Sequence, residues 1–213
     1  MRNHRKIQLA DFNRMAILTA ANTLFLSRGV ESTRMDEIAE GAGFSKTTLY
    51  TYFESKQDIL DHLILDGMVC FHQQIKLIAS RQNPFREFYR EFCQALIDIH
   101  DDGVVYFQGM TGKIGYSVKE TDDRKVLMDI YLIGEEMNQI IAAQISRAVE
   151  QKELTLNAPI TDVIMLFWLC LTGLVEKSSS KEEYLVRHLE KDRVAFLNFA
   201  FESLLLMIEK RSE

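Results

Sequence analysis

Proline and glycine are scarce in this chain, with two prolines and ten glycines among 213 residues. Both residues interrupt helices, so their scarcity removes the commonest reason for a helix to end. The chain also lacks the Val- and Thr-rich alternating runs that are typical of strands, whereas Leu, Ile, Met, Glu and Lys are abundant. We therefore expect an all-α fold of about nine helices.

Cysteine is equally rare, and its placement argues against a disulfide framework. Cys70, Cys93 and Cys170 are odd in number, widely spaced and embedded in apolar runs. This pattern favours a reducing cytoplasm, with the cysteines as buried small hydrophobes and a thiol redox switch as the alternative. Residues 1–11 carry basic residues without the apolar segment of a signal peptide, so we expect no export.

Long hydrophobic runs are absent as well. The most apolar stretch, Val163–Val175, falls well short of the roughly 20 residues that cross a bilayer. It predicts a buried helix or a subunit interface and no membrane partner.

Signatures of catalysis are missing too. The sequence has no phosphate-binding glycine loop, HExxH, CxxC or nucleophile elbow. A metal at His100-Asp101-Asp102, or at Cys70 with His72, is the alternative, but adjacent or alternate residues on a helix point apart. We expect no enzyme activity, no cofactor and no metal site.

The net charge of −6 is unevenly distributed. Residues 1–60 hold eight Lys/Arg against seven Asp/Glu, which leaves 17 basic against 24 acidic residues in the remainder. An acidic chain with a less acidic N-terminal region is compatible with DNA binding through that region alone.

The first sixty residues predict three helices in close succession. After a polar arm, apolar residues at three- and four-residue spacing indicate a first helix that ends near Gly29. Thr33, Ser45 and Ser55 are hydroxyl residues suited to cap the next starts. They predict short helices over Arg34–Ala42 and Ser45–Tyr52, packed by Ile38, Ala39, Phe44, Leu49 and Phe53.

Longer helices should follow over 55–80, 85–101, 124–152, 159–177 and 182–210, with loops and short turns over 103–117. We expect two domains. A helix-turn-helix head comprises residues 1–54, and a helical body for effector binding and dimerisation comprises residues 55–213.

The stretch from Thr33 to Lys56 resembles the DNA-binding head of the tetracycline-repressor (TetR) family. One more residue stands between Thr33 and the Ile-Ala pair than in the family pattern. The matching residues are Thr33, Ile38, Ala39, Ala42, Gly43, Phe44, Ser45, Leu49, Tyr50, Tyr52, Phe53 and Lys56.

A short helix held against two others can present its outer face to the major groove of DNA. Lys46, Thr47 and Thr48 are the candidates for base contacts, and Thr33, Tyr50, Tyr52 and Lys56 for phosphates. The full candidate set for DNA is Thr33, Arg34, Ser45, Lys46, Thr47, Thr48, Tyr50, Tyr52 and Lys56. Capping alone also explains the hydroxyls of Thr33 and Ser45, and the arm Arg2–Lys6 fits either a minor groove or disorder.

Two strongly apolar C-terminal stripes predict a homodimer. The candidate interface is Phe167, Leu171, Leu174, Leu197, Phe201, Leu204 and Leu205. The TetR resemblance implies such a two-fold dimer, which places two recognition helices about 34 Å apart on a near-palindromic operator. The alternative is that these stripes fill the core of the single chain.

The resemblance also implies an effector pocket in the body. The candidates are Met68, Phe71, Phe88, Phe92, Tyr106, Phe107, Met110 and Tyr131, and plain core is the alternative for each. The sequence thus predicts a repressor that a small-molecule effector releases from operator DNA by shifting the helix that starts at Ser55. The alternative is a ligand-binding or scaffold protein on the same fold without operator binding.

Overall fold

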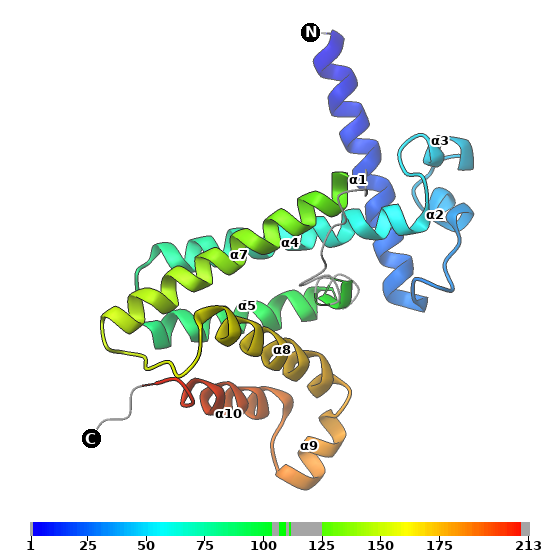
Figure 1. Ribbon diagram of the computed structural model, residues 1–213. Helices are drawn as coiled ribbons and strands as arrows, with labels where there is room; N and C mark the ends of the chain where they lie inside the picture. The colour runs from blue at the N-terminus through cyan, green and yellow to red at the C-terminus, as the bar shows by residue number, and fades with distance from the viewer. Residues whose placement is uncertain (1, 104–106, 110, 112–124, 210–213) are drawn as a thin grey trace. The chain divides into compact units, whose positions relative to one another are not determined.

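The computed structural model describes the backbone of residues 2–103, 107–109, 111 and 125–209, with side chains from residue 8 onward. The named elements are all helices, drawn in Figure 1: α1 (Arg2–Arg28), α2 (Met35–Gly41), α3 (Lys46–Tyr50), α4 (Lys56–Ser80), α5 (Phe85–Asp102), α7 (Lys125–Glu150), α8 (Ile160–Ser179), α9 (Glu182–Leu189) and α10 (Arg193–Leu205). The all-α prediction is confirmed. Among the described residues, no helix is long and apolar enough to span a membrane.

Two predicted boundaries are wrong. The polar arm is no separate segment, because α1 is helical from Arg2 onward and no glycine or proline stands before Gly29. The expected last helix over 182–210 is two helices, α9 and α10. Glu190 between them has a φ of +53°, and the Asp192 side chain accepts a hydrogen bond from the Ala195 N–H at 2.7 Å to start α10.

The chain forms two compact units. Unit 1 comprises Met1–Gly67 and Gly103–Ile130, and unit 2 comprises Met68–Asp102 and Tyr131–Glu213. The helices α4 and α7 each contribute residues to both units. The division into domains at residues 54 and 55 stays a prediction.

In unit 1, α2 packs against α1 and α3 packs against α2, and Figure 1 shows the two short helices beside the long α1. Their shared core joins side chains of α1, α2, α3 and the start of α4. The predicted packing residues Ile38, Ala39, Leu49 and Phe53 are buried in it, and Phe44 packs against it. This core fixes the direction in which α3 presents its outer face.

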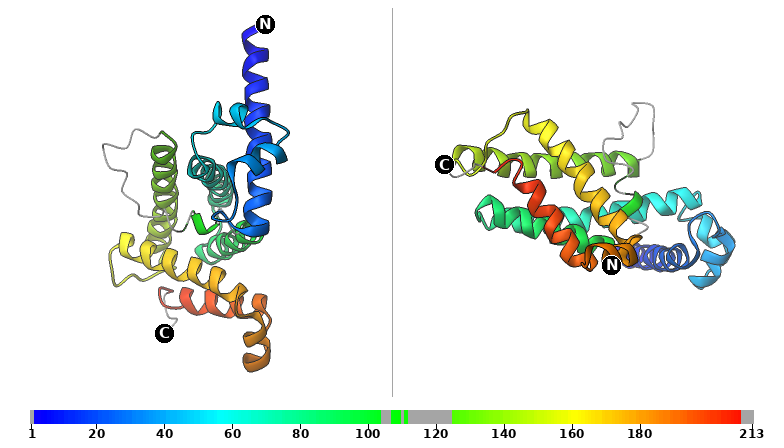
Figure 2. Two further views of the ribbon diagram at one scale, coloured as in Figure 1. Left: turned by 90° about the vertical axis from the view of Figure 1, so that its right-hand side faces the viewer. Right: turned by 90° about the horizontal axis from the view of Figure 1, so that it is seen from below.

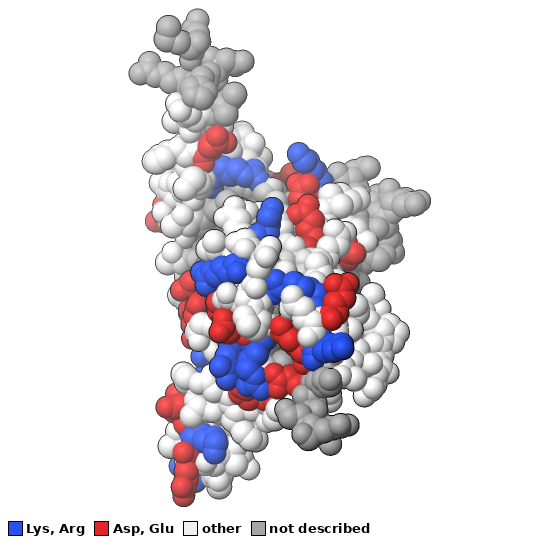
Figure 3. Space-filling view, turned by 90° about the vertical axis from the view of Figure 1, so that its left-hand side faces the viewer, with Lys and Arg blue, Asp and Glu red and all other residues white. Residues whose placement is uncertain are grey.

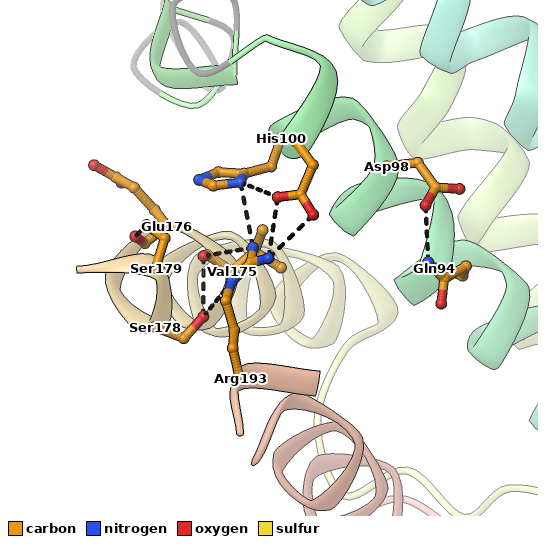
Figure 4. A network of polar contacts seen from close by, with 9 residues as sticks. Gln94, Asp98, His100, Val175, Glu176, Ser178, Ser179 and Arg193 are labelled. Atoms are coloured by element: carbon orange, nitrogen blue, oxygen red, sulfur yellow. Dashed lines mark hydrogen bonds and ion pairs between the residues drawn. The ribbon is translucent and has the colours of Figure 1, made fainter. Parts of the chain in front are cut away.

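In unit 2, α5, α8 and α10 pack pairwise, and Figures 1 and 2 show α8 and α10 side by side. Arg193 joins the three helices (Figure 4). Its guanidinium donates to both Asp101 carboxylate oxygens at 3.0 and 3.1 Å and to the Ser178 hydroxyl at 3.2 Å. Burial opposes the charged form of Asp101, but the hydrogen bonds from His100 and Arg193 outweigh it and lower the pKa of this carboxyl.

Candidate nucleic-acid interface and effector cavity

The turn between α2 and α3 is set by Gly43, whose φ is +74°. The Gly43 N–H donates to the Glu40 carbonyl at 3.0 Å, and the Phe44 N–H reaches back to the Ala39 carbonyl at 2.8 Å. These two bonds form the Schellman arrangement that closes a helix and satisfies its last carbonyls. Because glycine adopts positive φ without steric cost, this position holds the sharp turn between the two helices.

The start of α3 is fixed by Ser45, as the sequence predicts. The Ser45 hydroxyl accepts a hydrogen bond from the Thr48 N–H at 3.1 Å, and the two hydroxyls of Ser45 and Thr48 lie 2.8 Å apart. Ser45 therefore caps the helix. The hydroxyl of Thr48 is already engaged in this cap, which leaves its methyl group as the simpler contact for a base.

The outer face of α3 presents Lys46, Thr47 and Tyr50, which are exposed, while Leu49 is buried beneath them. The Lys46 ammonium lies 2.8 Å from the Asp36 carboxylate of α2. This hydrogen bond and the charge of Asp36 raise the pKa of Lys46. The sequence does not reveal Asp36 as a partner, because only the packing of α2 on α3 brings the two together.

Two predicted phosphate contacts have structural roles inside the head. Thr33 is buried at 1% exposure, and its hydroxyl donates to the Gly29 carbonyl at 2.9 Å. The ammonium of Lys56 donates to the carbonyls of Glu31 and Thr33, each at 3.1 Å. Both side chains stabilise the loop between α1 and α2.

The predicted capping role of Thr33 is wrong. The residue before α2 is Arg34, whose backbone N–H donates to the Glu37 carboxylate at 2.8 Å. This bond from Arg34 lowers the pKa of Glu37. The Arg34 side chain is exposed beside the start of α2, and its guanidinium lies 3.6 Å from the Glu37 carboxylate.

Tyr52 is partly buried, and its hydroxyl accepts a hydrogen bond from the Asn13 amide at 2.9 Å. Arg14 of α1 stacks on the Phe53 ring, with its guanidinium carbon 4.5 Å from the ring centroid. These contacts from α1 hold Tyr52 and Phe53, which follow α3, in place. Sequence reasoning missed Asn13 and Arg14, because neither belongs to the motif and both lie nearly forty residues away from their partners.

Unit 2 contains an apolar cavity of about 30 Å³. Its walls come from α5, α7 and α8, and Ile208, which follows α10, also lines it. The aromatic wall consists of Phe85, Phe88, Tyr89, Phe92, Phe167 and Trp168. Of the predicted pocket residues, Phe88 and Phe92 line this cavity.

The other predicted pocket residues are dispersed. Met68 and Phe71 are buried in unit 2 without lining the cavity, Phe107 is buried in unit 1, and Tyr131 is exposed. Tyr106 and Met110 lie outside the described residues. A larger groove of about 360 Å³ lies elsewhere in unit 2, and its lining includes the polar side chains of Arg90, Gln94, Asn198 and Glu202.

The candidate dimer residues divide into two groups. Leu171, Leu197, Phe201 and Leu205 are buried within the subunit, whereas Phe167, Leu174 and Leu204 are partly buried. The exposed apolar residues on the same helices are different ones: Met165, Leu166, Leu169, Val194 and Phe199. The predicted apolar periodicity is present, but the buried members of the predicted dimer interface point toward the subunit's own core.

Charge is intermixed on the surface drawn in Figure 3, where basic and acidic side chains of the described residues lie side by side.

Among the described residues, no group of three or more His, Cys, Asp or Glu side chains could hold a metal ion. Cys93 is buried, and burial raises the pKa of its thiol.

A sharp glycine turn followed by a capped five-residue helix with an exposed polar face is the geometry of a helix-turn-helix unit. Residues 17–63 match the bacterial regulatory proteins of the tetR family. In this part of the sequence the chain is similar to the tetR family.

Three known proteins illustrate the likeness. The HTH-type transcriptional repressor KstR2 of Mycobacterium tuberculosis is 31% identical over 97 residues, which cover 43% of this chain and 48% of KstR2. The match thus spans about half the length of that relative. IcaR of Staphylococcus aureus, a negative transcriptional regulator of the biofilm operon icaADBC, is 23% identical over 171 residues, covering 78% of this chain and 88% of IcaR.

The fold recurs in the transcriptional regulator FadR of Bacillus subtilis, solved in complex with stearoyl-CoA. The TM-score is 0.56 at 19% identity, with 89% of this chain and 96% of that chain covered.

Proposed function

We propose that this protein is a dimeric transcriptional repressor that binds a palindromic operator through α3 and leaves it when an apolar effector enters unit 2. The observation that carries the proposal is the exposed face of α3. Lys46 and Thr47 stand outward on a helix whose start is capped by Ser45 and whose preceding turn is closed by Gly43. A short helix with a capped start and an exposed polar face suits the major groove.

Lys46 and Thr47 have the chemistry to read bases. A lysine donates to guanine O6 and N7, and threonine offers a hydroxyl and a methyl group that contacts thymine. Arg34 and Tyr50 are both exposed, and we expect them to contact phosphates and set the register. Ser45, Thr48 and Tyr52 support this surface through the contacts that they make within the head.

The proposed dimer uses the exposed apolar residues of α8 and α10. Leu169 is 66% exposed and Phe199 is 60% exposed, and each belongs to a helix with further exposed apolar side chains. Exposed apolar surface of large extent marks protein–protein interfaces. A two-fold pair would present two copies of α3, as operator half-sites in successive major grooves require.

The proposed coupling runs from the cavity through α4. Phe71 of α4 has its ring centroid 5.7 Å from that of Phe92 and 6.2 Å from that of Trp168, both of which line the cavity. A ligand that displaces these two rings therefore acts on Phe71. Because α4 is one continuous helix that begins at Lys56, a shift at Phe71 is transmitted toward the head.

The relatives support the regulatory half of this proposal, since KstR2 and IcaR are named as transcriptional repressors or negative regulators. FadR of Bacillus subtilis holds a ligand with a long apolar chain. An apolar cavity in unit 2 is consistent with a ligand of low polarity for this chain as well.

The test is selection of bound sequences from a random duplex pool by the full-length protein. We expect an enriched near-palindrome bound by two protomers, and loss of enrichment in the variant with both Lys46→Ala and Thr47→Ala. The control is Lys76→Ala, an exposed lysine on α4, which should select the same sequence. A folded protein that enriches nothing would contradict operator binding and favour a ligand-binding or scaffold role.

A further inference from the structure

A groove of about 360 Å³ lies between α5 and α10, and we call it the α5–α10 groove. At one end, Arg90 of α5 donates to Glu202 of α10 at 2.7 Å. Beyond the other end, Arg193 of α10 donates to Asp101 of α5 at 3.0 Å. The two helices are thus tied on both sides of the groove. Its volume falls within the range of about 300 to 1,000 Å³ that is typical of small-molecule sites.

The floor of the groove is apolar. Cys93, Ile97 and Phe201 are buried, each at 8% exposure or less. Tyr89 also lines the groove, and its hydroxyl already donates to the Phe201 carbonyl at 3.0 Å. Burial raises the pKa of the Cys93 thiol, which therefore stays protonated near neutral pH. The floor offers contact to an apolar group, and its two rings suit an aromatic one.

The rim of the groove is polar and holds both donors and acceptors. The Gln94 amide nitrogen donates to Asp98 at 2.8 Å (Figure 4), which leaves the Gln94 carbonyl oxygen as an acceptor. Arg90 contacts Glu202 through Nε, which leaves its two terminal nitrogens as donors. Asn198 is exposed, and its amide makes no hydrogen bond within the part of the chain that the structure describes.

The charges beside the groove are balanced, which argues against an ionic ligand. One oxygen of Glu202 accepts from Arg90 and the other from Arg86, and Arg86 also pairs with Glu209. Two arginines and two glutamates leave no net charge for a ligand to neutralise. Asp98, the next acid on α5, is not a lining residue. An ionic ligand group would lose hydration here without a counter-charge, whereas a neutral polar group is stabilised by hydrogen bonds.

We propose that the α5–α10 groove is a ligand site distinct from the apolar cavity and that its ligand is a neutral aromatic amide. An amide carries a donor and an acceptor in one plane, which complements the donors and acceptors of the rim. The ring of the ligand lies on the apolar floor. Among their described lining residues, the groove and the cavity share only Tyr89. The inference goes beyond the proposed function and does not depend on operator binding.

The test compares three probes that have the same ring and differ in charge at neutral pH. 2-Phenylacetamide is neutral, phenylacetate is an anion and 2-phenylethylamine is a cation. Their binding to the full-length protein is measured by saturation-transfer NMR and titration calorimetry, without DNA. We expect 2-phenylacetamide to bind and both ions to bind at least about 5-fold more weakly, because a charge that is desolvated without a partner is penalised.

Substitutions at Asn198 locate the bound probe. Asn198→Ala should weaken binding of 2-phenylacetamide about 3- to 10-fold, as expected for the loss of one hydrogen bond. Asn198→Trp, which fills the groove, should abolish binding. Because Asn198 is exposed, we expect both variants to fold. The matched control is Asn157→Ala, an exposed asparagine before α8 that does not line the groove, and it should bind like the wild type.

Absence of 2-phenylacetamide binding, or equal binding of the three probes, would overturn the ligand class. Equal affinity of the wild type, Asn198→Ala and Asn198→Trp for 2-phenylacetamide would place the probe elsewhere and overturn the site. Operator selection is measured separately from probe binding. Its failure would therefore count against the repressor function alone, and failure of the probe against this inference alone.

Discussion

At the residue scale, the Lys46–Asp36 pair lies on the face that we propose meets DNA. The two groups lie 2.8 Å apart, and both side chains are exposed. DNA must compete with Asp36 for the ammonium, and the carboxylate also repels phosphates. We predict that Asp36→Asn raises operator affinity a few-fold at low salt, measured by fluorescence anisotropy of a labelled duplex.

Glu40→Gln is the matched control for Asp36→Asn. Glu40 is an exposed acid on the same short helix, so its replacement removes the same charge without releasing Lys46. A smaller gain in Glu40→Gln than in Asp36→Asn is expected. Equal gains in the two variants would show that overall charge, and not the Lys46 pair, sets the effect.

Thr33 provides a prediction about stability. Its buried hydroxyl bonds the Gly29 carbonyl, so Thr33→Val leaves that carbonyl without its partner. We predict a loss of about 1 kcal/mol in the free energy of unfolding by urea, with unchanged operator affinity of the folded protein. Thr23→Val, which removes an exposed hydroxyl on α1, should change stability little. A stable Thr33→Val that binds DNA weakly would instead favour a phosphate contact.

The role of a residue was predictable from the sequence only where its residue type and its position in the chain allow a single role. Ser45 stands directly before a helix and has the hydroxyl of a cap, and it caps α3. Thr33 fits either a cap or a phosphate contact, but it is a buried donor to a loop carbonyl. The ammonium of Lys56 reaches carbonyls more than twenty residues earlier, which local sequence does not encode.

At the element scale, Gly43 and Gly41 offer a matched pair of substitutions at the end of α2. Gly43 has a φ of +74°, which an alanine adopts only with strain. Gly41 is helical, and an added Cβ would lie 3.5 Å from the Ala20 Cβ, an ordinary contact. We predict that Gly43→Ala destabilises the protein by about 1 kcal/mol and that Gly41→Ala is neutral or stabilising by about 0.5 kcal/mol.

Thermal unfolding followed by circular dichroism checks this pair of glycine variants. Gly43→Ala should also weaken operator binding, because the turn orients α3. If both variants unfolded at the wild-type temperature, the positive φ of Gly43 would not be what holds the turn.

Element boundaries followed from sequence where a punctuating residue marks them. Ser55 caps the start of α4 through the Asp58 N–H at 3.1 Å, and Gly29 ends α1 with a φ of +84°. The break between α9 and α10 has no such mark. It contains neither glycine nor proline, and Glu190 adopts the left-handed conformation that sequence patterns assign to other residues.

At the scale of the whole molecule, dimerisation yields a prediction. A charge on the exposed apolar faces of α8 and α10 would be buried without a partner in the dimer. We predict that the variant with both Leu169→Lys and Phe199→Lys is a folded monomer that binds the operator weakly, as measured by light scattering and anisotropy.

Leu77→Lys is the control for the interface variant, since Leu77 is an exposed leucine on α4, at 60% exposure, outside α8 and α10. It should remain dimeric. A dimeric Leu169→Lys, Phe199→Lys protein would place the subunit interface elsewhere.

The proposed interface also shows that apolar periodicity does not determine which side of a helix faces the subunit core. The stripes of α8 and α10 identified apolar helices, but each helix carries apolar residues on two sides. Leu171 and Leu197 are buried in the subunit, whereas Leu169 and Phe199 are exposed. Spacing alone does not reveal which side meets the rest of the chain, since that depends on how α5 packs against both helices.

The most direct test of the central claim compares the affinities of the protein for its selected operator and for a scrambled duplex of equal length. With the wild type, the operator should bind about 10³-fold tighter or better at physiological salt. Thr47→Ala should reduce this ratio about 10-fold while leaving binding to the scrambled duplex unchanged, because Thr47 is proposed to contact bases. Equal affinity of the wild-type protein for both duplexes would contradict the claim that α3 reads a DNA sequence.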